Sequence, residues 1–141
     1  MRRLSICAVA LVLTACGGKS PTAPSDHLAT GTWSGAITTD VGVNGTMTLV
    51  LTQNDSGAIS GSAVIQLPAL SIPNGTVSGG VPPAARAPVQ SGLSISVGGP
   101  CPATFAAPST FTTATTLDGS IAGGNPSCGV DLSGRFSLRK A

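Results

Sequence analysis

From residue 31 onward, the chain is a series of short runs in which apolar and polar residues alternate. Met47, Leu49 and Leu51 are separated by polar or β-branched residues, which is the two-residue period of a strand with one buried face. The alternation returns at residues 93–97 and 130–138, and no segment after the first 15 residues has a convincing helical period. The pattern predicts about eight strands, at residues 31–38, 45–53, 58–66, 74–80, 89–97, 104–116, 119–124 and 129–139.

Turn residues separate these runs. Asn-Asp-Ser-Gly at 54–57 predicts one hairpin, and Leu117-Asp118-Gly119 predicts a second, because aspartate and glycine favour turn conformations. Asp40, Asp55 and Asp118 are therefore interpreted as turn residues that cap their own backbone. Asp131 is the one acidic residue that we place within a strand, facing solvent.

A sequential antiparallel sheet of this size tends to close on itself, since closure removes its two edges. We therefore predict an all-β fold for residues 31–141, an up-and-down meander barrel of about eight strands.

A short unit recurs within the predicted strands: an apolar residue, then Ser or Ala, then Gly. We interpret its glycines as positions where a strand bends or another backbone comes close; the alternative is a simple excess of small residues in this chain. The unit occurs as Trp33-Ser34-Gly35, Ile59-Ser60-Gly61, Val77-Ser78-Gly79, Ile121-Ala122-Gly123 and Leu132-Ser133-Gly134.

The first 15 residues have the three parts of an export signal: basic residues at 2–3, an apolar run at 4–13 and small residues before Cys16. The apolar run is too short for a membrane-spanning helix, which needs about 20 residues. Residues 16–30 are small, polar and Pro-containing, a composition typical of a flexible linker. The predicted organisation is a signal peptide at 1–15, a linker at 16–30 and a barrel domain at 31–141.

Leu13-Thr14-Ala15-Cys16 resembles a lipobox, the motif at which bacterial lipoproteins are lipidated and cleaved. The resemblance implies a diacylglycerol thioether on Cys16, a new N-terminus at that residue and attachment to a membrane. Gly17 follows the cysteine of this motif. In lipoproteins of this type an aspartate at that position implies retention at the inner membrane, so the glycine implies localisation to the bacterial outer membrane. The alternative is ordinary signal cleavage with a free cysteine nearby.

Charge and cysteine content narrow the chemistry of the mature chain. After residue 15 it carries five Lys or Arg and five Asp, so it lacks the basic footprint of a nucleic-acid-binding protein. Cys101 and Cys128 remain as an even pair in an exported domain, which predicts one disulfide; the alternative is two unpaired buried thiols. His27, the single histidine, lies in the linker, so we predict no metal site.

Gly31-Thr32-Trp33 resembles the Gly-x-Trp motif on the first strand of lipocalins and the Gly-Thr-Trp opening of avidin-type barrels, together the calycin-type folds. In that group a basic residue on the last strand packs across the tryptophan. The resemblance implies that Arg135 or Arg139 closes the barrel over Trp33. Avidin-type barrels bind biotin with several tryptophans and a tyrosine, which this chain lacks, and the Pro-rich segment 81–88 maps onto neither family.

Catalytic constellations are missing from the sequence. It has no paired carboxylates in one expected pocket, no triad histidine outside the linker and no phosphate loop, so we predict neither an enzyme nor a cofactor. Two functional classes remain: a binding module for a small apolar ligand or an envelope protein partner, or a structural surface lipoprotein with a filled barrel. Eight-stranded barrels are either filled by side chains or hold one small ligand. The candidate inward residues are Val, Ile, Leu and Ala, which is compatible with a cavity.

Overall fold

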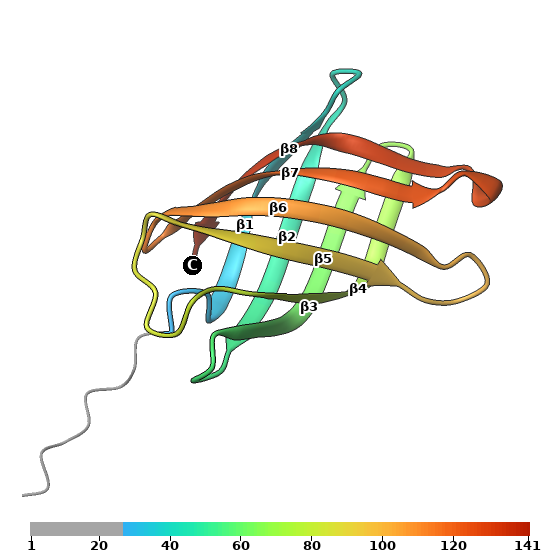
Figure 1. Cartoon of the computed structure of the whole chain (residues 1–141). Helices are drawn as coiled ribbons and strands as arrows, with labels where there is room; N and C mark the ends of the chain where they lie inside the picture. Colours follow the sequence, from blue (N-terminus) through green and yellow to red (C-terminus); the bar gives the residue numbers. More distant parts are fainter. Residues whose placement is uncertain (1–26) are drawn as a thin grey trace, which may run out of the picture.

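Eight antiparallel strands, each hydrogen-bonded to its neighbours in chain order, close into a barrel when the last strand pairs with the first. The computed structural model describes residues 27–141 (Figure 1). The predicted all-β meander is confirmed. The strands are β1 (Gly31–Thr39), β2 (Asn44–Gln53), β3 (Ala58–Leu67), β4 (Leu70–Gly80), β5 (Val89–Val97), β6 (Ala103–Thr113), β7 (Thr116–Asn125) and β8 (Val130–Lys140), with a 3-10 turn, η1 (Pro126–Cys128), before β8.

One hairpin turn lies elsewhere than predicted. β6 and β7 are joined by the two residues 114–115, and Thr113 pairs with Thr116, so the prediction of a turn at Leu117-Asp118-Gly119 is wrong. In the observed register Leu117 lies opposite Phe111, and both side chains are fully buried. Burial of two large apolar side chains fixes the register, and it outweighs the turn preference of Asp-Gly.

β4 begins four residues earlier than the predicted 74–80. Pro73 and Asn74 stand opposite the single residue Val64, since Ala63 pairs with Gly75 and Ile65 pairs with Ile72. A bulge of this kind accommodates a proline inside a strand. Because proline is disfavoured inside strands, the sequence pattern did not predict that the strand begins before Pro73.

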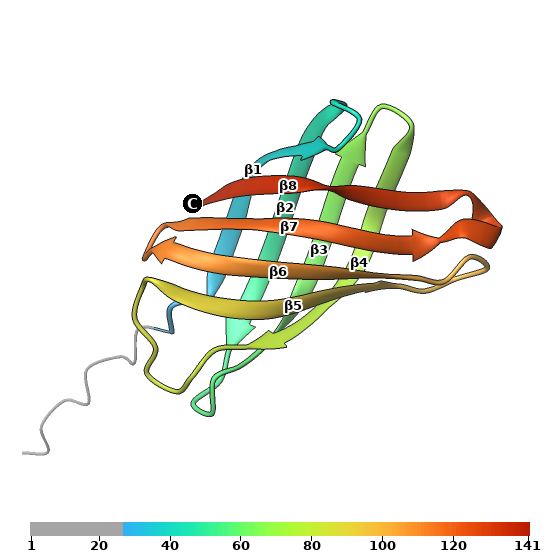
Figure 2. The ribbon, with the colours of Figure 1, turned by 45° about the horizontal axis from the view of Figure 1, so that its top comes forward.

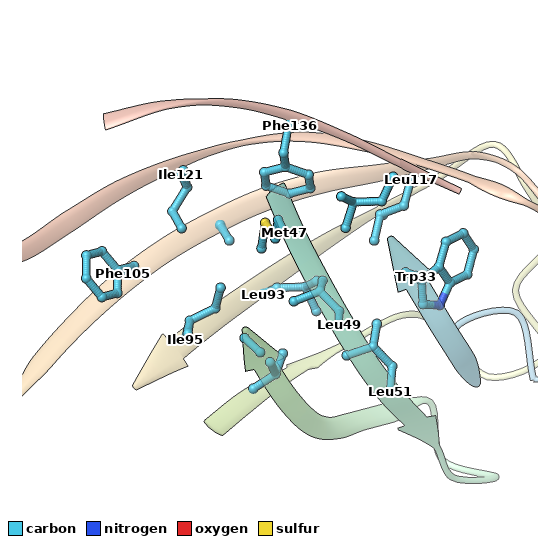
Figure 3. Close-up of a cluster of buried hydrophobic side chains, with 14 of the residues drawn as sticks. Trp33, Met47, Leu49, Leu51, Leu93, Ile95, Phe105, Leu117, Ile121 and Phe136 are labelled. Atoms are coloured by element: carbon cyan, nitrogen blue, oxygen red, sulfur yellow. The ribbon is translucent and has the colours of Figure 1, made fainter. Parts of the chain in front are cut away.

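All four aromatic residues of the chain are buried, and Figure 3 shows Trp33, Phe105 and Phe136 inside the barrel. Trp33, Phe105 and Phe111 are fully buried, and Phe136 is nearly so. The interior therefore differs from the expected lining of small and medium aliphatic residues. Aromatic side chains fill volume that a ligand would otherwise need, and they pack with Met47, Leu49, Leu51, Ile65, Ile95, Leu117, Ile121 and Leu138.

The recurring glycines stand where backbones approach one another. A Cβ atom on Gly35 would lie 2.1 Å from the Ser137 carbonyl oxygen, and one on Gly61 would lie 2.0 Å from the Val50 carbonyl oxygen. The glycines of the other three units would meet a carbonyl oxygen at 2.7 Å or less. All five have the same inward orientation as the buried residues two positions before them, so they allow the strands to bend sharply around the core. This supports the structural interpretation of the repeated unit.

The barrel has two distinct ends. We call the end where β1 starts the N-terminal end; it carries the loops 54–57 and 81–88, the turn 114–115 and the end of β8. The far end carries the loops 40–43, 68–69, 98–102 and 126–129. At the far end β1–β4 diverge from β5–β8 (Figure 2), since β4 and β5 pair through only three residue pairs. Among residues 27–141, no helix is long and apolar enough to cross a membrane.

Candidate functional site

Residues 27–30, which we call the plug, close the N-terminal end of the barrel, and they are the last residues of the predicted linker 16–30. Ala29 is fully buried there, and its N–H donates a hydrogen bond to the Gln53 side-chain oxygen at 3.0 Å. The N–H of Gln53 in turn donates to the Thr30 hydroxyl oxygen at 2.9 Å. These bonds give the buried polar groups partners, and they fix the plug against the end of β2.

Trp33 lies directly inside the plug. Its indole Nε1–H donates to the Ala29 carbonyl oxygen at 2.8 Å, and Phe111 packs edge-on at a ring-centroid distance of 5.3 Å. On the neighbouring strand, the Lys140 Nζ lies 5.3 Å from the indole centroid and donates to the Leu28 carbonyl oxygen at 3.2 Å. The indole thus joins the plug, the core and the last strand.

The cation over the indole is Lys140 and not an arginine, so the prediction of Arg135 or Arg139 there needs correction. Both arginines occupy outward, exposed positions of β8, whereas Lys140 has the same parity as the inward-facing Leu138. Lys140 is also the cross-strand partner of Trp33. The two-residue period of the strand decides the matter, and counting two residues forward from the apolar Leu138 in the sequence gives the same answer.

A wide hollow of about 1310 Å³ opens beside the plug, at the same end of the barrel. Its walls come from the plug, the 54–57 loop, the Pro-rich 81–88 segment and the β6–β7 turn, which are far apart in the sequence. Its apolar lining comprises Leu28, Pro83, Ala84, Ala85, Ala87 and Ala114; its polar and charged lining comprises His27, Thr30, Gln53, Asp55, Arg86, Thr112, Thr113 and Lys140.

The lining of the hollow has more cationic than anionic side chains. Arg86 and Lys140 face a single carboxylate, Asp55, whose side chain is 95% exposed and lies 3.4 Å from the His27 Nε2. A carboxylate so exposed is screened by water. Lys140 uses one of its three N–H donors on the Leu28 carbonyl. Apolar walls with two cationic side chains suit a ligand that has an apolar body and an anionic group.

A second, smaller depression of about 450 Å³ lies on the wall over β5, β6 and β7, beside Asp118. The Asp118 carboxylate accepts hydrogen bonds from the Ser137 hydroxyl at 2.6 Å and the Thr112 hydroxyl at 2.8 Å. These two bonds, with a smaller contribution from the charge of Arg139, hold the pKa of Asp118 below its ordinary value of 3.8. Both carboxylate oxygens already have partners, so Asp118 pins neighbouring strands together. This role replaces the predicted one in a turn.

The far end carries the predicted disulfide. Cys101 precedes β6 and Cys128 ends η1; the two are bonded, with their Cα atoms 5.9 Å apart. The Asn125 side-chain amide donates to the Pro102 carbonyl at 2.8 Å and joins the same two loops. The prediction is confirmed, because a turn at 114–115 brings the open ends of the β6–β7 hairpin together as a turn at 118 would.

Some of the other predicted features lie outside the described residues. The signal peptide, Cys16 and the start of the linker lie outside the described residues, so lipidation and membrane attachment stay predictions. Across residues 27–141, no cluster of three or more His, Cys, Asp or Glu side chains could hold a metal ion. Asp131 lies in β8 and is exposed, as expected.

No protein-family model and no curated protein matches this chain. Three solved structures with a similar fold are designed or redesigned barrels. A redesigned β-barrel is 14% identical, with a TM-score of 0.54 over 86% of this chain and 99% of its own. A redesigned barrel named mFAP1, bound to DFHBI, is 10% identical, with a TM-score of 0.54 over 83% and 98%. A de novo fluorescence-activating β-barrel is 14% identical, with a TM-score of 0.51 over 83% and 97%. At such identities the likeness is one of fold.

Proposed function

We propose that this protein is a membrane-anchored, non-enzymatic binding module of the bacterial envelope, which binds a small amphiphilic ligand in the hollow at the N-terminal end. The chemical character of the hollow is the observation that supports this proposal. It combines apolar walls from the plug and the 81–88 segment with the cations Arg86 and Lys140. Ligand sites are typically concave and mostly apolar, with a few placed polar groups.

The packed core favours the hollow over the barrel interior as the ligand site. An interior ligand would have to displace fully buried side chains such as Phe105 and Phe111, whereas the hollow needs no such displacement. The fold is compatible with this role, since the mFAP1 barrel is bound to the small molecule DFHBI.

The anchor is the second part of the proposal. Acylation of Cys16 in the lipobox-like motif would hold the domain at the outer membrane through a linker of ten residues before His27. Two or more acyl chains give firm attachment, because each buried CH₂ contributes about 0.8 kcal/mol.

A second candidate function is a structural surface lipoprotein with no ligand. The observation that favours it is the filled interior, in which all four aromatic side chains are packed. The two functions differ in whether the hollow is occupied in the cell.

Native mass spectrometry can separate them. The mature protein, purified from its own host and released from its acyl chains, is expected to retain a small molecule. Arg86→Gln should lose that mass, and Arg135→Gln, which changes an exposed arginine outside the hollow, should keep it. An unliganded mass in every preparation would favour the structural role.

A further inference from the structure

We propose that the hollow docks on the membrane surface and binds the phosphate of an anionic lipid headgroup in the leaflet that carries the anchor. The barrel would then stand with its N-terminal end toward the bilayer and its disulfide-bonded loops away from it. This inference rests on the proposed function, and it names the ligand class of the same hollow.

The path of the chain brings this end of the barrel to the membrane. Cys16 precedes His27 by eleven residues, and a fully extended chain spans at most about 3.6 Å per residue, or roughly 40 Å in all. The chain enters the fold at the plug, beside the hollow (Figure 1). The far end lies a further strand length away, roughly 30 Å for strands of this size. The anchor is therefore attached at the end of the barrel that carries the hollow, about one strand length nearer along the path of the chain than the far end.

The charged residues are distributed unevenly along the barrel, with most of the cations toward the N-terminal end, as docking on an anionic surface requires. Among the described side chains, Arg86, Lys140 and Arg139 lie toward the N-terminal end, with two carboxylates, Asp55 and Asp118. Asp40 and Asp131 lie at the far end, Arg135 lies in the middle of β8, and β2–β6 carry no charged residue. An anionic surface attracts the N-terminal end and repels the far end.

The lining chemistry fits a lipid headgroup. Arginine and lysine are the usual phosphate ligands, arginine through its planar fork and lysine as a point charge. Lys140 is held in place by Trp33 and by the Leu28 carbonyl, so little side-chain freedom is lost on binding. Pro83 and Ala84, both exposed, offer apolar contact to the glycerol and the upper part of the acyl chains.

Vesicle co-sedimentation tests the proposal without the anchor. The mature chain from residue 16, with Cys16→Ser to prevent acylation, is mixed with phosphatidylcholine vesicles that contain about a quarter phosphatidylglycerol, or none. We expect binding to the anionic vesicles and much weaker binding to the neutral ones. Arg86→Gln should weaken binding to anionic vesicles about fivefold, the effect of one basic residue near the surface. Arg135→Gln is the matched control and should leave binding unchanged.

Three outcomes would overturn the docking proposal: equal binding to both vesicle types, equal loss in the two arginine variants, or binding of free glycerol phosphate to the hollow as tight as that of the vesicles. The last result would assign the site to a soluble phosphate. The proposed function fails separately, if the protein from its host lacks acyl groups on Cys16 or carries no ligand, and neither measurement depends on vesicle binding.

Discussion

Replacement of Trp33 by alanine should be among the most damaging single substitutions in the domain. The indole is fully buried and contacts three parts of the fold: Phe111 in the core, Lys140 on the last strand and the Ala29 carbonyl in the plug. Its removal leaves a cavity and a buried carbonyl without its donor at the same time.

The magnitude follows from these contacts. Truncation of a buried aromatic residue to alanine costs about 3–5 kcal/mol. An edge-to-face aromatic pair adds about 0.5–1.5 kcal/mol beyond burial, and a buried acceptor left unpaired costs about 1–3 kcal/mol. These effects overlap, so we expect the upper end of the first range, about 5 kcal/mol, for Trp33→Ala. Trp33→Phe keeps a ring beside Phe111 and loses the N–H donor, for which we expect about 2 kcal/mol.

Urea unfolding followed by circular dichroism measures both variants against the unsubstituted protein. Val50→Ala, at an outward and 48% exposed position of β2, is the control and should change stability by less than about 0.5 kcal/mol. Because Trp33 is the only tryptophan, the fluorescence of the folded protein reports its burial directly. A loss below about 1 kcal/mol for Trp33→Ala, or an emission maximum like that of free indole in water, would refute the placement.

Three further predictions concern other parts of the chain. Replacing Cys101 and Cys128 by serine opens a loop with a sequence separation of 27, so chemical denaturation should show a loss of about 3.6 kcal/mol; an unchanged midpoint would count against that reasoning. The lowered pKa of Asp118 means that its carboxylate stabilises the fold above its ordinary pKa of 3.8, and that this contribution is lost as the pH falls through the lower folded-state value. Asp118→Asn should therefore flatten the loss of stability between neutral and acid pH, and an acid limb as steep as before would contradict this. Cys16→Ser should abolish incorporation of labelled lipid in the host and leave an unprocessed precursor, whereas a mature, fully soluble periplasmic form of the unsubstituted protein would rule out the anchor.

Local signals in the sequence determined the strands and their order. The alternation at Met47, Leu49 and Leu51 needs no distant residue for its interpretation, since the period of two is a property of one strand. The recurring glycines and the Cys101–Cys128 pair were likewise informative on their own, because each has a requirement that few other residues meet: no Cβ atom at a close backbone approach, and a thiol partner in an oxidising compartment.

Register needed the tertiary structure. The Leu117-Asp118-Gly119 sequence favours a turn locally, yet Leu117 is buried opposite Phe111 and Asp118 bonds across to β8. Likewise, the local pattern placed the start of a strand at Asn74, directly after Pro73, whereas β4 begins at Leu70. Burial and cross-strand bonding involve residues that the local pattern does not contain.

The hollow is the feature that only the tertiary structure could decide. The sequence determined that a barrel would form and that a tryptophan would lie on its first strand, but it assigned residues 27–30 to a linker, whereas Leu28 and Ala29 are buried against the barrel. Closure of β1 on β8 places Lys140 beside Trp33, more than a hundred residues apart in the chain, and the same closure gathers the plug and the 81–88 segment around one opening. No periodicity encodes such a meeting, because it results from the geometry of the whole closed sheet, whereas each strand is specified within about ten residues of its own chain.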